Sequence, residues 1–148
     1  RFYKTSESRF LPGNTRMSID FPPNKRYYWH THPPTAGWWP SAEDLLRNDA
    51  RHVLFTRFGT YVWSGRGARG GGVNADALFA VWRSFNKYMT RKTQADWTPD
   101  VVLKRIERLT NNLKRCCGIT LAFVPLFHVG SEHDVLNHVS RVGKLLSK

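Results

Sequence analysis

Two histidines separated by one residue, His30 and His32, lie upstream of Asp44 in an aromatic stretch of the chain. Alternate side chains of a β-strand share a face, so imidazoles at this spacing would point the same way. Pro33 and Pro34 follow at once and would end the strand, which places both rings at its rim. Two imidazoles and a carboxylate, with a fourth position open to water, are typical of a catalytic zinc site. The spacing therefore indicates a metal centre.

The same aspartate also has an interpretation that requires no metal. Residues 40–50 predict a short helix in which Ser41 is the N-cap and Asp44 is the third helical residue. Ser-x-x-Asp is a variant of the capping box, and an acidic residue in the first turn suits the helix dipole. The capping interpretation stays open, although the fixed spacing between the histidine pair and this fragment favours the metal centre.

From His30 to Asp44 the sequence follows the pattern H-x-H-P-x(7)-S-x(2)-D. This pattern resembles the JAMM motif of the MPN/JAB metalloprotease family. The strand pair expected over residues 51–64 resembles the layout that follows the motif in that family, and beyond Ser64 we find no family pattern. The resemblance implies an α/β fold of MPN/JAB type, similar in outline to cytidine deaminases, with a mixed, curved sheet flanked by helices.

The resemblance also implies a role for each residue of the motif. His30, His32 and Asp44 would bind Zn²⁺, and Ser41 would hydrogen-bond the reacting water or the tetrahedral intermediate. Glu7, the only glutamate before the histidines, would act as general base and acid. The implied activity is zinc-dependent amide hydrolysis by a peptidase or an isopeptidase. Its substrate would be a protein, with ubiquitin-like conjugates, and so a deubiquitinase, among the candidates.

The elements that must position these residues follow from the apolar periodicity and the turn signals. Strands are expected over 1–11, 15–21, 26–32, 52–58, 60–64 and 119–126, the last as a buried strand because its apolar run is continuous. Helices are expected over 40–50, from Asn74 to Met89, from Thr98 to Gly118, and over 134–146. Residues 64–73, rich in glycine and arginine, predict a flexible loop. We interpret residues 1–148 as one domain, and the start at Arg1 indicates processing or a longer parent chain.

The chain is strongly basic, with 23 Lys and Arg against 11 Asp and Glu and a formal charge of +12. Such a surplus favours contact with nucleic acid or an acidic partner, and equally fits a surface that only confers solubility. The candidate nucleic-acid contacts are Arg66, Arg69, Arg105, Arg108 and Lys114. The charge therefore keeps a second function open, a catalytically silent MPN-like module with a structural or nucleic-acid-binding role in a larger assembly.

Three further features of the sequence bear on function. Trp38 and Trp39 would border a substrate groove or pack as core. The histidines and acids of residues 128–138 lack the spacing of a helical zinc site, so metal is not expected there. Adjacent cysteines rarely pair, so Cys116 and Cys117 predict packing without a disulfide and a reducing, intracellular setting in cytoplasm or nucleus. No apolar run is long enough to predict a membrane span.

Overall fold

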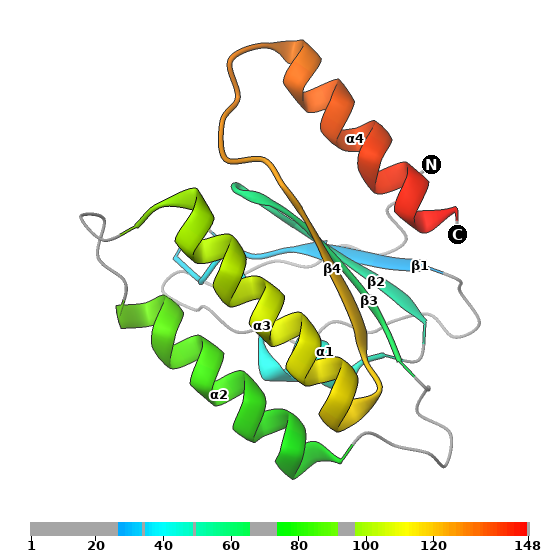
Figure 1. The fold of residues 1–148 in the computed structure, drawn as a ribbon. Coiled ribbons are helices and arrows are strands. Elements are labelled where there is room, and N and C mark those ends of the chain that lie inside the picture. The colour runs from blue at the N-terminus through cyan, green and yellow to red at the C-terminus, as the bar shows by residue number, and fades with distance from the viewer. Residues whose placement is uncertain (1–26, 34, 49, 66–73, 92–96, 148) are drawn as a thin grey trace.

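The computed structural model describes residues 27–33, 35–48, 50–65, 74–91 and 97–147. Their elements, in chain order, are β1 (Tyr27–Thr31), α1 (Ala42–Leu46), β2 (Arg51–Thr56), β3 (Gly59–Ser64), α2 (Ala75–Arg91), α3 (Pro99–Cys117), β4 (Thr120–Pro125) and α4 (Glu132–Leu146). The strands form one mixed sheet in the order β1-β2-β3-β4, in which β1 is parallel to β2 and the other pairs are antiparallel (Figure 1). The expected α/β class is therefore confirmed at this level.

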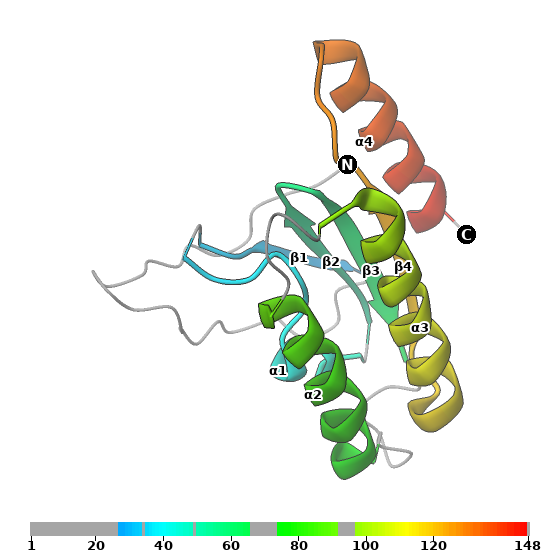
Figure 2. The same ribbon diagram turned by 60° about the vertical axis from the view of Figure 1, so that its left-hand side comes forward.

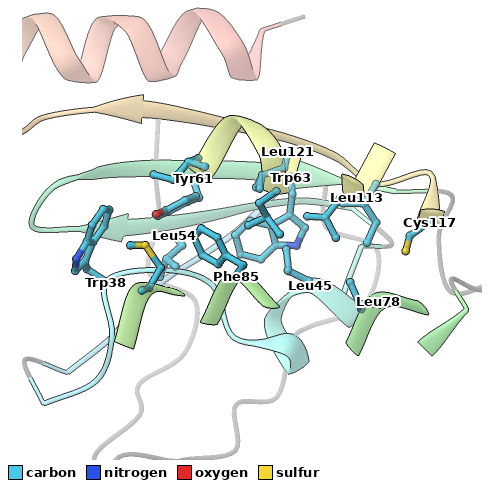
Figure 3. Packing of buried hydrophobic residues seen from close by; sticks show 14 of the residues in the cluster. Trp38, Leu45, Leu54, Tyr61, Trp63, Leu78, Phe85, Leu113, Cys117 and Leu121 are labelled. Carbon is cyan, nitrogen blue, oxygen red and sulfur yellow. The ribbon is translucent and has the colours of Figure 1, made fainter. Parts of the chain in front are cut away.

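One face of the sheet forms the main core. Paired positions on neighbouring strands share a face, and His30, Leu54, Tyr61 and Phe123 are in register across all four strands. This face packs against apolar side chains of α1, α2 and α3 in a single buried cluster. Figure 3 shows Leu45 of α1 and Phe85 of α2 next to Leu54, Tyr61 and Trp63 of the strands. His30 thus projects from β1 on the side where the helices pack.

The opposite face of the sheet is covered by α4. Val53, Val62 and Val124 point to this face, and Val142 of α4 packs against them. Figures 1 and 2 show α4 on the other side of the sheet from α2 and α3. The edge strand β4 contributes Leu121 to one face and Val124 to the other, and both side chains are buried. Packing on both faces explains the continuous apolar run of this strand, although β4 lies at the edge of the described sheet.

The helix signals of the sequence are confirmed. Thr98 caps α3 by accepting a hydrogen bond from the backbone N–H of Val101, and Gly118 ends the helix in the left-handed conformation. The apolar sides of both helices are buried, with Leu78, Phe85 and Met89 on α2 and Val102, Ile106, Leu109 and Leu113 on α3. These two helices therefore present their polar sides outward and their apolar sides to the sheet.

The expectation that the adjacent cysteines would not pair is wrong. Cys116 and Cys117 are joined by a disulfide in the last turn of α3. Cys116 is exposed and Cys117 is buried in the main core, so the packing role expected for Cys117 is compatible with the bond. Disulfides between adjacent cysteines are rare, but the local geometry at this helix end allows one. The observation that favoured a reducing compartment is thereby removed.

Some of the expected features lie outside the described residues. These include the two strands over 1–11 and 15–21, Glu7, Arg66 and Arg69, and all but the first two residues of the loop expected over 64–73. Within the described residues, no helix combines the length and apolarity that crossing a membrane would require.

Candidate metal centre

The candidate metal centre lies where β1 ends and α1 begins. His30 is the penultimate residue of β1, and His32 is the first residue after the strand. The chain then returns through α1 to β2, which runs parallel to β1, so the first turn of α1 lies beside the carboxyl end of β1. Asp44 is in that first turn. The topology therefore brings three residues from two elements to one edge of the sheet, as the sequence predicted.

The three side chains are close enough to share one ion. Nε2 of His30 lies 3.1 Å from Oδ1 of Asp44, and Nε2 of His32 lies 2.9 Å from Oδ2. One ligand atom from each residue lies within 4.8 Å of the others. Ligands of a tetrahedral zinc ion lie about 2.0–2.2 Å from the metal, hence roughly 3.3–3.6 Å from one another. The observed separations are close to this spacing, so the three residues fit a metal ion.

His32 faces hydrogen-bond acceptors on both sides of its ring. Nδ1 lies 2.9 Å from the carbonyl oxygen of Gly37, and Nε2 lies against the Asp44 carboxylate. A neutral imidazole carries one N–H, so the second nitrogen needs a proton or a metal ion between it and the facing oxygen. Burial lowers the pKa of His32, but the bonds to Asp44 and Gly37 outweigh burial and raise it. The arrangement therefore attracts a cation at Nε2.

His30 has two buried ring nitrogens without a hydrogen bond from any described residue. Its Nε2 is at ion-pair distance from Asp44 but not in hydrogen-bonding direction. The ring lies edge-on to Trp63, 6.3 Å between centroids, on the apolar face of the sheet. A buried nitrogen lone pair without a donor is costly unless another partner satisfies it. A metal ion at Nε2 would satisfy it.

Asp44 is both the acidic member of the capping box of α1 and a candidate metal ligand. The two interpretations of this residue therefore do not exclude each other. Its Oδ2 accepts a hydrogen bond from the backbone N–H of Ser41 at 2.9 Å, while its Oδ1 faces His30. Burial raises the pKa of Asp44, but its contacts with His30 and His32 and the Ser41 N–H hold the pKa well below its usual range. The carboxylate is therefore ionised, as a metal ligand must be.

Ser41 is the N-cap of α1, as predicted. Its Oγ accepts a hydrogen bond from the backbone N–H of Asp44 at 3.0 Å, which completes the capping box. This bond uses the hydroxyl oxygen as an acceptor and does not engage the hydroxyl hydrogen. The side chain therefore retains a donor three residues before the carboxylate ligand Asp44.

The other candidates differ in where the structure places them. Trp38 is buried in the main core against Phe58 and Tyr61, which favours the packing interpretation. Trp39 is half-buried and donates from Nε1 to Oδ1 of Asn86 on α2. In the part of the chain that the structure describes, residues 128–138 form no cluster that could hold a metal ion, and no fourth side chain joins the centre.

Gly37, Trp82 and Asn86 hold the centre indirectly and were not predicted from the sequence. Gly37 contacts His32 through a backbone carbonyl, and α2 supplies the other two residues more than 40 positions downstream. A backbone acceptor and a contact between distant elements leave no local pattern in a sequence. The spacing of four residues between Trp82 and Asn86 puts both on one face of α2, but the same spacing occurs in any helix.

Comparison of the chain with protein-family models, with curated proteins and with solved structures found no match. The described residues form a mixed α/β fold with a candidate metal centre at the edge of its sheet.

Proposed function

We propose that the chain is a zinc-dependent amide hydrolase of the JAMM type, with the metal centre at His30, His32 and Asp44. The observation that carries the proposal is the convergence of these three side chains, at the spacing that resembles the family motif, on one point of the structure. Two imidazoles and one carboxylate suit zinc and leave a fourth position for substrate or water.

The proposed roles of His30, Asp44 and Ser41 are supported by their geometry, and that of Glu7 is what the resemblance to the JAMM motif implies. The zinc ion would supply Lewis-acid chemistry, since a bound zinc ion lowers the pKa of a water to about 7 and polarises a carbonyl. His30 lies on a strand of the sheet, and Asp44 lies in a capped helix turn. Ligand atoms fixed in this way need little rearrangement during the reaction. Ser41 would donate its hydroxyl hydrogen to the oxygen that becomes negative during attack on an amide. Glu7 would take the proton from water and deliver it to the leaving amine.

Cleavage assays test this function. Zinc-loaded protein should cleave either a di-ubiquitin panel or unstructured peptides, and a chelator should abolish the cleavage until zinc is restored. Cleavage that survives complete removal of zinc would contradict a zinc-dependent mechanism. If the fully loaded protein cleaves no member of either set, the alternative of a catalytically silent MPN-like module replaces the hydrolase.

A second candidate function, nucleic-acid binding, is favoured by how the charge is distributed. Helices α2 and α3 together carry eight Lys and Arg against three Asp and Glu, whereas α1 and α4 carry two against four. The two basic helices pack side by side. We define the basic surface as their exposed cations, which are Arg83, Lys87, Arg91, Lys104, Arg108, Lys114 and Arg115.

Of the predicted contacts on this surface, Arg108 and Lys114 are exposed, and Lys114 donates to Oγ1 of Thr120. Arg105 is half-buried, since its guanidinium bonds Oγ of Ser84 and lies over the ring of Tyr88. It joins α3 to α2 instead of extending into solvent. The basic surface is therefore formed by the other cations of the two helices. Arg105 contributes to it by holding α3 against α2.

Salt dependence tests this candidate. Binding of single-stranded RNA should weaken steeply as salt rises, and the double substitution Lys104→Ala with Arg108→Ala should reduce the slope by about 2, roughly one per phosphate contact. The matched control removes Arg141 and Lys144, two exposed cations of α4 on the opposite side of the sheet. Equal loss in both double variants, or no binding at low salt, would contradict a nucleic-acid surface on α2 and α3.

A further inference from the structure

The segment from His32 to Ser41, here called the ligand loop, is held against α2 by two tryptophan hydrogen bonds. Nε1 of Trp39 donates to Oδ1 of Asn86 at 3.0 Å, and Nε1 of Trp82 donates to the carbonyl oxygen of Pro40 at 2.9 Å. Trp82 and Asn86 are four residues apart, so they share one face of α2. Two consecutive loop residues are therefore held by a helix that supplies no metal ligand.

Trp39 is in turn in close contact with Gly37. A Cβ atom at Gly37 would lie 2.7–2.9 Å from carbon atoms of the Trp39 indole, closer than a real Cβ approaches any neighbour. The indole therefore occupies the space that a side chain at this position would need. Because Nε1 of Trp39 is fixed by Asn86, the ring restricts the backbone of Gly37 on that side.

The carbonyl of Gly37 is the group that orients His32. It accepts from Nδ1 at 2.9 Å, so Nδ1 carries the proton and Nε2 is left to face Asp44. A partner that fixes the tautomer and direction of a histidine also sets its strength as a metal ligand. A loop carbonyl can do this only if the loop itself is held. The contacts run without a break from Asn86 through Trp39 and Gly37 to His32.

We propose that Asn86 and Trp39 are positioning residues for the metal ligand His32, a role that rests on the proposed metal centre. They act through the Gly37 carbonyl and are not among the metal ligands. Trp38, buried against Phe58 and Tyr61, anchors the same loop to the core. Loss of the Trp39–Asn86 bond leaves this anchor in place, so the loop stays folded while the carbonyl of Gly37 gains freedom. Metal affinity is then reduced without loss of the fold.

Three variants test the role, with zinc affinity measured by chelator competition and the site geometry by the visible spectrum of the Co²⁺-substituted protein. Asn86→Leu removes the acceptor, Trp39→Phe removes the donor but keeps a ring against Gly37, and Asn86→Asp keeps an acceptor. The first two variants should bind zinc about tenfold more weakly than the parent and should change the Co²⁺ spectrum. Tenfold is the lower end of the ~10–100-fold in metal affinity that hydrogen-bond partners of metal ligands contribute. Asn86→Asp should bind at least as tightly as the parent.

Asn137→Leu is the matched control, since it makes the same change at an exposed position of α4, on the far side of the sheet. It should leave both readouts unchanged. The positioning role is overturned if Asn86→Leu and Trp39→Phe show the parent's affinity and spectrum while His30→Ala loses the metal, or if Asn86→Asp weakens binding as much as Asn86→Leu. If Asn86→Leu does not fold, Trp39→Phe decides. A parent protein that binds neither zinc nor Co²⁺ overturns the metal centre together with this role.

Discussion

Asp44→Asn should remove stoichiometric zinc from the purified protein, and His30→Ala should do the same. Both residues have a ligand atom within 4.8 Å of the other members of the centre, and the described residues offer no fourth ligand to replace a lost one. Loss of one ligand of three should weaken affinity well beyond the ~10–100-fold that outer partners contribute. Elemental analysis after gel filtration measures the metal content directly.

The chain contains a matched control for Asp44. Asp134 occupies the same third position in the capping box of α4, where its Oδ2 accepts from the backbone N–H of Ser131 at 3.1 Å. Asp134→Asn therefore reproduces the change at a helix cap whose neighbours His128 and His133, in the part of the chain that the structure describes, do not gather with it into a group that could hold a metal ion. This variant should retain full zinc. Full zinc in both Asp44→Asn and His30→Ala would show that the ion, if present, is bound elsewhere.

Glu7→Gln should keep the fold and the zinc and lose roughly 10²–10⁴-fold in the rate of hydrolysis, which is the usual contribution of acid–base catalysis. Glutamine keeps the shape of the side chain and cannot accept the proton. The prediction rests on the resemblance to the JAMM motif, because Glu7 lies outside the described residues. The measurement compares the hydrolysis rates of Glu7→Gln and the parent protein on the substrate that the cleavage assays identify.

The control for this substitution is Glu107→Gln, at an exposed position of α3 remote from the metal ligands in sequence. It should hydrolyse as fast as the parent. If Glu7→Gln also matches the parent, another residue is the general base. The role assigned to Glu7 would then be wrong, whereas the metal centre would stand.

Local features of the site were predictable from the sequence because short-range rules determine them. Strand alternation places His30 and His32 on one side, and the Ser-x-x-Asp pattern places Asp44 next to the N-terminus of α1. The turn of α1 back to a parallel strand then brings the two fragments together. What the pattern did not show is that one carboxylate can serve the cap with Oδ2 and face His30 with Oδ1.

Contacts between distant elements were not predictable. Nothing near Trp39 indicates that its indole N–H would bond Asn86, because the pairing depends on how α2 packs against α1 and the ligand loop. The apolar run of β4 likewise indicated burial but not that α3 and α4 cover its two faces. The disulfide between Cys116 and Cys117 depends on geometry at the end of α3 that residue identity alone does not determine.

The most direct test of the metal centre is anomalous scattering at the zinc absorption edge from crystals of the zinc-loaded protein. The centre predicts one strong peak about 2.0–2.2 Å from Nε2 of His30, Nε2 of His32 and Oδ1 of Asp44. A crystal without zinc at these three residues, or with its only zinc peak among residues 128–138, would contradict it.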